Sequence, residues 1–159
     1  MAKLGVVKSI YIAPQAKGPA NAVARVQAVP GYGLEGDRYF KKTGTFSPKD
    51  VPDRQVTLIE TEALEGLARE YSIELADGDA RRNIVTSGVA LNHLVGQEFR
   101  VGEAVLLGTR LCEPCDHLES LTKPGVRAGL IHRGGLRAQI VVGGTIAVGD
   151  ELHEACSRF

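Results

Sequence analysis

Short stretches with strand-like alternation dominate the pattern of apolar and polar positions along the chain. Each stretch is rich in β-branched residues and is bounded by Gly, Pro or charged residues, which is typical of strands. The predicted strands are 4–13, 22–29, 54–59, 83–86 and 96–107. The last segment forms one or two strands, with a break at Gly102. The segment 14–19 carries Pro, Gly and Lys and is predicted to connect the first two.

Two apolar stretches near the C-terminus flank a diglycine. Residues 136–142 and 145–148 alternate around Gly143 and Gly144, which is typical of a hairpin. Strands at short intervals with Gly-rich turns favour a closed barrel over a parallel βαβ sheet. We therefore predict a mainly β fold, a closed β-barrel with flanking helices.

Helical spacing is clearest over 61–71. Ala63, Leu64, Leu67, Ala68 and Tyr71 fall on one face, and Thr61 is a plausible N-cap. A shorter helix is predicted at 117–121, ended by Pro124 and Gly125. Residues 41–53 are polar with two prolines and are predicted to form a loop or flap.

Length and charge favour one ordinary globular domain spanning residues 1–159. The 19 Lys and Arg residues balance the 19 Asp and Glu residues, so the excess cationic charge that drives duplex nucleic-acid binding is absent. The sequence has neither a run of about 18 apolar residues nor a signal-peptide pattern, so we expect no membrane contact and a cytoplasmic location.

The segment around Cys112 and Cys115 is the clearest candidate for chemistry. Pro114 fixes the chain before Cys115, and a helix beginning just after it would direct its N-terminal dipole at the thiol and favour the thiolate. Cys115 is the predicted catalytic residue, with Cys112 and His117 as further catalytic candidates. The alternative is that both cysteines are small buried apolar side chains.

The C-x-x-C spacing leaves two other interpretations open. A zinc site needs a second paired cluster, which His93, His132 and Cys156 do not form. A thioredoxin-like pair would normally open a long helix in a βαβ unit, and that context is absent. Reversible disulfide formation between Cys112 and Cys115 remains open, and Cys156 is interpreted as incidental.

Three polar clusters could bind an anion such as a phosphate. Each combines charged side chains with glycine or an amide, and each could instead be a capped turn or a solvated corner. The residues predicted to bind a ligand are Asp37 and Arg38, then Arg81, Arg82 and Asn83, and finally Arg133 in the segment Arg133-Gly134-Gly135-Leu136-Arg137. Their number beside a candidate thiol favours a phosphorylated ligand.

Five segments taken in order resemble the MOSC domain, the module at the C-terminus of molybdenum cofactor sulfurases. They are GLEGDR (33–38), RRNIVTSG (81–88), the L-x-G-x-x-F-x-V-G pattern (94–102), PCDHL (114–118) and GGLRAQIVVGGTIAVGD (134–150). The resemblance covers most of the chain and is to small stand-alone bacterial-type members. Many of these carry a His-Gly-Gly segment after GLEGD, where this chain has KKTGTFSPKDVPDR.

The resemblance implies a MOSC-type β-barrel with a pocket for the pterin and phosphate of the molybdenum cofactor, molybdopterin. Cys115 would carry persulfide sulfur or ligate molybdenum, as a soft thiolate can, and the arginines and Asn83 would meet the phosphate. Expected partners are a cysteine desulfurase or a molybdoenzyme. Pyridoxal phosphate would belong to the desulfurase, since no such domain is present.

Three functional hypotheses follow from the resemblance and the thiol. The first is a sulfur carrier that passes a persulfide from Cys115 to a metal or another acceptor. The second is a molybdenum-dependent reductase of N-hydroxylated compounds. The third is a non-catalytic module that binds a pterin or another anionic small molecule.

Overall fold

Strands outnumber helices in the computed structural model, which describes residues 3–15, 18–37, 40 and 55–155. The strands are β1 (Lys3–Ile12), β2 (Asn21–Val23), β3 (Arg25–Val29), β4 (Gly33–Leu34), β5 (Val56–Glu60), β6 (Ile84–Ser87), β7 (Glu98–Val101), β8 (Ala104–Leu111), β9 (Leu136–Val142), β10 (Gly144–Ala147) and β11 (Glu151–Glu154). The helices are α1 (Thr61–Tyr71), α2 (Asp116–Leu121) and α3 (Val126–Gly129), with 3₁₀ turns η2 (Asp77–Ala80) and η3 (Leu91–Leu94). The predicted loop at 41–53 lies outside the described residues.

Seven strands close into a barrel, which confirms the predicted fold class. Their order is β11-β7-β8-β9-β5-β6-β1, and β1 pairs with β11 to complete the ring. The β5–β6 pair is parallel, whereas the other pairs of the ring are antiparallel. The barrel is filled by a single apolar cluster that includes Ile10, Leu58, Phe99 and Leu136.

The predicted C-terminal hairpin is wrong. β9 pairs with β8 along its length and with β5 over Leu136–Ala138, and none of the described pairings joins it to β10. β10 instead pairs with β3 in a second sheet of order β10-β3-β4. The predicted strand 22–29 divides for the same reason, because β2 pairs with β1 while β3 pairs with β10.

The last strand was not predicted from the sequence, yet it closes the barrel. β11 contains only one fully buried side chain, Leu152, between polar neighbours. It fits between β1 and β7, whose edges it satisfies on both sides. Its strand conformation therefore depends on the partners more than on its own apolar content.

Helix α1 has the predicted bounds, but its N-cap is not Thr61. Glu60, in extended conformation, occupies that position without a side-chain capping bond, and Thr61 is the first helical residue. Ser72 ends the helix in the left-handed region at φ 56°, with its N–H directed at the carbonyls of Leu67 and Ala68. Ala63 and Leu64 pack against Ile59 and Val85 of the barrel wall.

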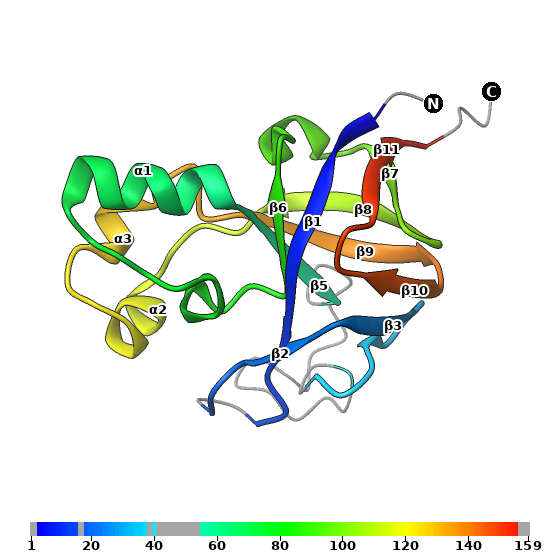
Figure 1. Cartoon of the computed structure of the whole chain (residues 1–159), viewed down its shortest axis with the longest axis horizontal. Helices are drawn as coiled ribbons and strands as arrows, with labels where there is room; N and C mark the ends of the chain where they lie inside the picture. The colour runs from blue at the N-terminus through cyan, green and yellow to red at the C-terminus, as the bar shows by residue number, and fades with distance from the viewer. Residues whose placement is uncertain (1–2, 16–17, 38–39, 41–54, 156–159) are drawn as a thin grey trace.

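The three helices lie together at one side of the barrel (Figure 1). Leu67 of α1, Leu118 of α2, Val126 of α3 and Leu130 form a small apolar cluster that joins them. α2 begins one residue before the predicted 117–121, and α3 was not predicted. This cluster fixes α2, and with it the end of the cysteine segment, against the rest of the fold.

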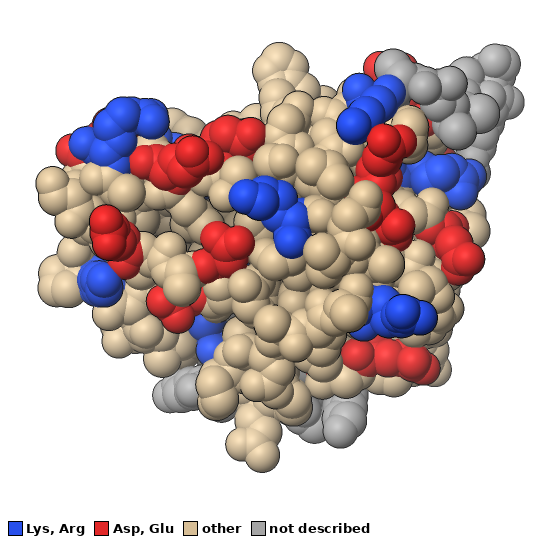
Figure 2. All heavy atoms as spheres, in the orientation of Figure 1, with Lys and Arg blue, Asp and Glu red and all other residues tan. Residues whose placement is uncertain are grey.

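Acidic and basic side chains are interspersed on the face seen in Figure 2, as the balanced composition leads one to expect. No helix within the described residues has the length and apolar character needed to cross a membrane.

Candidate functional site

The segment from Cys112 to Cys115 connects β8 to α2 and presents two thiols differently. Cys112 is 1% exposed, and its N–H donates to the carbonyl of Gly135 at 2.7 Å. Cys115 is exposed and is the N-cap residue of α2, with its carbonyl accepting the N–H of Glu119 at 3.1 Å. A helix thus begins directly after Cys115, as the sequence analysis predicts, and an incoming molecule reaches this thiol first.

The outer side of this segment is tied to the chain that follows α3. The carboxylate of Glu113 accepts the N–H of His132 at 2.7 Å and meets its Nδ1 at 3.0 Å. His132 is held in the left-handed region at φ 65°, and its carbonyl accepts a bond from the amide of Asn92. These bonds fix the outer side of the cysteine segment at Glu113.

The guanidinium of Arg82 clamps the cysteine segment from within. Only 9% of this residue is exposed, and its donors reach the carbonyls of Gly134 (2.8 Å), Cys112 (3.1 Å) and Ala80 (3.5 Å). A buried cation is stable only when its donors are satisfied in this way. Arg82 lines the pocket, but its guanidinium hydrogen-bonds to backbone carbonyls of the protein itself.

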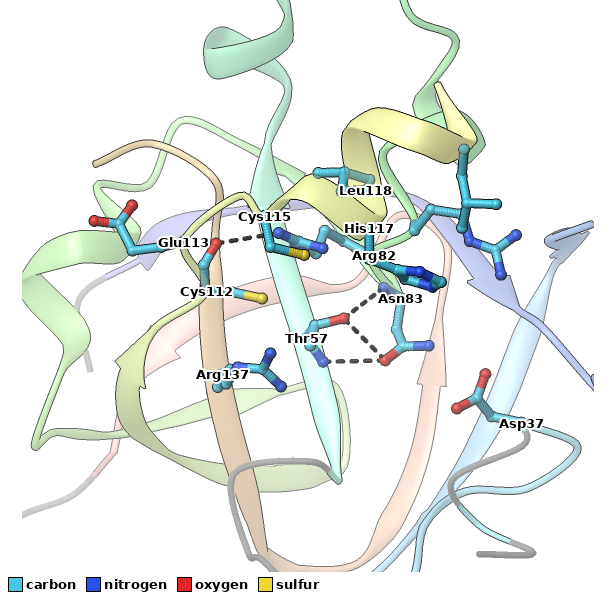
Figure 3. A pocket seen from close by; sticks show the side chains of 12 residues that line it. Asp37, Thr57, Arg82, Asn83, Cys112, Glu113, Cys115, His117, Leu118 and Arg137 are labelled. Atoms are coloured by element: carbon cyan, nitrogen blue, oxygen red, sulfur yellow. Dashed lines mark hydrogen bonds between the residues drawn. The ribbon is translucent and has the colours of Figure 1, made fainter. Parts of the chain in front are cut away.

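The side chain of Asn83 also hydrogen-bonds to other parts of the protein itself. Its Oδ1 accepts both the N–H of Thr57 at 3.0 Å and the hydroxyl of Thr57 at 3.1 Å (Figure 3). Its Nδ2 donates to the carbonyl of Tyr11. These bonds join β5, β6 and β1 beside the pocket. The amide therefore organises the barrel wall below the thiols.

Arg137 contributes a guanidinium to the pocket that the prediction did not single out. It lies on β9, opposite Thr57 of β5 and opposite Arg110 of β8, so the three side chains share one face of the sheet. Its Nε is buried, and within the described part of the chain no acceptor hydrogen-bonds to it. A buried donor of this kind favours an acceptor supplied by a ligand.

The predicted ligand residues Asp37 and Arg81 are both at the pocket. Asp37 is 2% exposed and accepts the N–H of Ala13 at 2.9 Å, which caps the end of β1. Arg81 adopts the left-handed region at φ 63° and donates to the carbonyl of Gly18. Arg38 lies outside the described residues.

Arg133 is placed elsewhere. Its guanidinium pairs with Glu70 of α1 at 3.2 and 3.3 Å, and its Nε donates to the carbonyl of Gly129. This guanidinium lowers the pKa of the Glu70 carboxyl below its ordinary value through that hydrogen bond. The structure therefore gives Arg133 a role in joining α1 to α3 and does not bring it to the thiols.

The two glycines that follow Arg133 allow close packing. A Cβ on Gly134 would lie 2.5 Å from the carbonyl oxygen of Cys112, and one on Gly135 would lie 2.2 Å from that of Leu58. Gly135 also has φ 122°, which side-chain-bearing residues rarely adopt. The diglycine thus lets the cysteine segment lie directly on the barrel wall.

A pocket lies beside the cysteine segment, with an empty volume of about 650 Å³ that includes its open mouth. Figure 3 shows its labelled side chains gathered around β5. The lining comprises Asp37, Thr57, Arg81, Arg82, Asn83, Cys112, Glu113, Cys115, His117, Leu118, Leu121 and Arg137. The structure therefore brings together the predicted residues of the first two anion clusters, Arg38 aside, and the cysteine segment.

Five lining residues were not among the predicted site residues, and one of them, Glu113, belongs to the cysteine segment itself. Thr57 and Arg137 enter through cross-strand register, and Leu118 and Leu121 enter through α2. Arg137 ends the segment Arg133-Gly134-Gly135-Leu136-Arg137, whose two arginines and two glycines were the available signal in the sequence. Within the described residues, no group of three or more His, Cys, Asp or Glu side chains is arranged to hold a metal ion.

Comparison with known proteins agrees with this architecture. A family model described as "MOSC domain" matches residues 43–153. The YuaD protein from Bacillus subtilis superposes with a TM-score of 0.78 at 19% identity, over 96% of this chain and 97% of that chain. No curated protein sequence matches the chain.

Two solved structures of YiiM are also similar. YiiM from Escherichia coli has a TM-score of 0.71 at 20% identity, covering 96% of this chain and 70% of that chain. YiiM from Geobacillus stearothermophilus has a TM-score of 0.67 at 15% identity, covering 97% and 73%. At these identities the likeness is one of fold.

Proposed function

We propose a function from one premise: the chain belongs to the MOSC domain family. This family is associated with the molybdenum cofactor. The proposed function is that of a sulfur carrier in molybdenum-cofactor chemistry, with the sulfur held as a persulfide on Cys115.

The observation that supports this proposal is the exposed Cys115 thiol on a pocket that also holds an unsatisfied guanidinium donor. The sulfur comes from the persulfide of a partner cysteine desulfurase. The Cys115 thiolate attacks the outer sulfur of that persulfide, a new S–S bond forms on Cys115, and the donor's cysteine leaves as a thiolate. Exposure of Cys115 allows this exchange without opening the barrel.

His117 is the nearest candidate for proton handling on the same element. It lies two positions after Cys115 in α2 and lines the same pocket. An imidazole can accept a proton near neutral pH and return it. We assign it the proton released when the Cys115 thiol becomes a nucleophile.

The polar lining of the pocket suits a phosphorylated pterin in its chemistry. Arg137, with its unsatisfied Nε, and Arg81 would hold the phosphate, and Cys115 would supply a soft sulfur ligand for the metal. When bound, the cofactor supplies a metal centre that accepts sulfur.

The test compares intact masses after incubation with a cysteine desulfurase and cysteine. At early times after mixing, the wild-type chain is expected to gain one reducible sulfur, about 32 Da, and this gain is absent from Cys115→Ser. Cys156→Ser is the matched control, since it removes a thiol that the proposal does not use. Molybdenum and pterin content are measured on the same freshly purified samples.

Each result decides between the hypotheses. A sulfur gain that survives in Cys115→Ser refutes the assignment of Cys115. No sulfur gain together with co-purifying molybdenum and pterin refutes the carrier in favour of the reductase of N-hydroxylated compounds. No sulfur gain and no metal refutes it in favour of a non-catalytic binding module.

A further inference from the structure

The two cysteines of the pocket differ sharply in access. Cys115 is exposed at the start of α2, whereas Cys112 is 1% exposed at the end of β8, and both line the same pocket (Figure 3). A large sulfur donor can meet only the first thiol. The second becomes relevant after the sulfur has arrived on Cys115.

The backbone of Cys112 is held firmly in this buried position. Its N–H donates to Gly135 at 2.7 Å, and its carbonyl accepts Nη2 of Arg82 at 3.1 Å. Cys115, in contrast, is exposed and is followed by a helix of six residues whose first residue, Asp116, is exposed as well. A fixed inner thiol beside an accessible outer thiol is the arrangement that dithiol chemistry uses for attack and resolution.

Resting on the proposed persulfide, we infer that Cys112 is the resolving thiol that releases its sulfur as sulfide. The Cys112 sulfur attacks the sulfur of Cys115 that carries the extra atom. A bond forms between the two cysteine sulfurs, the bond to the outer sulfur breaks, and that atom leaves as HS⁻ with the proton given up by Cys112.

Electrons balance within this step. The outer sulfur gains two electrons and becomes sulfide, and the two cysteine sulfurs together lose two and become a disulfide. A small dithiol reductant then returns the disulfide to two thiols. The chain would thus deliver sulfide, where a single cysteine can transfer only sulfane sulfur.

Attack at the outer sulfur is the competing path. It would move the persulfide from Cys115 to Cys112, release nothing and leave the mass unchanged. Cys112 attacks a different sulfur atom of the persulfide in each path, so the products distinguish the two paths.

The experiment is a single turnover on persulfide-loaded protein. Cys156→Ser is the parent, so that only the pocket thiols take part, and wild type is run beside it. After loading by a cysteine desulfurase and removal of donor and cysteine, free sulfide is measured with time, without reductant. About one equivalent of sulfide per persulfide is expected, with a final mass about 2 Da below the reduced chain.

Two variants isolate Cys112, with circular dichroism checking that each remains folded. Cys112→Ser and Cys112→Ala are both expected to load one sulfur on Cys115 and to release sulfide at least about tenfold more slowly. They should keep the gain of about 32 Da until a dithiol is added. Addition of the dithiol should then release the sulfur from them.

Failure of this inference is separable from failure of the carrier function. Loading of the Cys156→Ser parent with sulfide release equal in the Cys112 variants, or a stable gain without sulfide, overturns the resolving role and leaves the carrier intact. No loading of wild type or parent overturns both.

Discussion

Nη2 of Arg82 donates a hydrogen bond to the carbonyl oxygen of Cys112 at 3.1 Å, although 30 positions separate the two residues in the chain. The same guanidinium reaches the carbonyl of Gly134 at 2.8 Å. One buried cation thereby joins the start of β6, the cysteine segment and the start of β9. This contact holds the backbone at Cys112 and thereby fixes the position of its buried thiol.

Replacement of Arg82 by Met should destabilise the fold strongly. The substitution leaves the carbonyls of Cys112 and Gly134 buried without their donor, and we expect a loss of about 2–4 kcal/mol in the free energy of unfolding. Urea denaturation measures it. Arg69→Met is the control, because the Arg69 side chain is 70% exposed and its loss should change stability by less than about 0.5 kcal/mol.

If Arg82→Met matched the Arg69→Met control in stability while weakening anion binding, the clamp would be refuted. Arg82 would then be a ligand-binding residue, as the sequence analysis predicts.

Replacement of Arg137 by Met should weaken anion binding at the pocket. Its buried Nε has no acceptor in the described part of the chain, and a charge-assisted bond to phosphate contributes about 1.5–3 kcal/mol, so affinity should fall at least about tenfold. Inorganic phosphate is the probe, and its effect on the thermal unfolding midpoint reports binding.

Arg133→Met is the matched control for this experiment. Its guanidinium pairs with Glu70, so the phosphate-induced shift should persist in that variant. Loss of the shift in Arg133→Met, with retention in Arg137→Met, would reverse the assignment of the two arginines.

Replacement of Gly134 by Ala should displace the cysteine segment. The added Cβ would lie 2.5 Å from the oxygen of Cys112 and 2.9 Å from Cδ of Pro114, and relief of such overpacking costs about 1–3 kcal/mol. Labelling of Cys112 by a thiol reagent in a Cys115→Ser, Cys156→Ser background should become faster as the segment moves outward.

Gly96→Ala separates this clash from a general effect of adding a methyl group. Gly96 has φ 79° but no atom within 4 Å of its added Cβ. It should lose stability through backbone strain alone, about 1–2 kcal/mol, with unchanged Cys112 labelling. Equal labelling rates in the two variants would contradict the close-packing role of Gly134.

The charge of Glu60 should make stability fall as pH rises. Burial raises the pKa of the Glu60 carboxyl from its ordinary value of 4.5, and the negative charge of Glu62 adds to this against the opposing hydrogen bond from Leu91. The unfolded chain then releases this proton at lower pH than the folded chain. The contribution to stability is full below 4.5 and is lost as pH rises through the higher folded value.

Glu60→Gln should remove that loss while keeping an oxygen to accept the N–H of Leu91. Relative to wild type, the variant should gain stability between about pH 4 and about pH 7, as measured by urea unfolding at several pH values. Glu65→Gln, on the exposed side of α1, should retain the wild-type pH dependence. A constant difference between Glu60→Gln and wild type across this range would refute the argument.

Much of the local structure was predictable because it depends on neighbours in the sequence. The spacing of Ala63, Leu64 and Leu67 determines both the bounds and the buried face of α1. The alternation over 96–107 predicted β7 and the start of β8, with Gly102 in the turn between them. The cysteine segment followed by a helix was equally local.

Pairing and site chemistry were decided only by the tertiary structure. β9 pairs with β8 and β5 whereas β10 pairs with β3, and β11 is a strand because β1 and β7 offer edges to it. No local pattern contains that information.

The sequence by itself determined that a thiol, arginines and glycines suited to a ligand site are present, and that the chain alternates as a β-barrel requires. Only the fold decided which arginine does what. Arg82 is satisfied by carbonyls from distant segments, Arg133 by Glu70, and Arg137 is left with a buried donor facing the thiols' pocket. The reason is physical: a guanidinium's role depends on which acceptors surround it, and those acceptors come together only when the strands and helices pack.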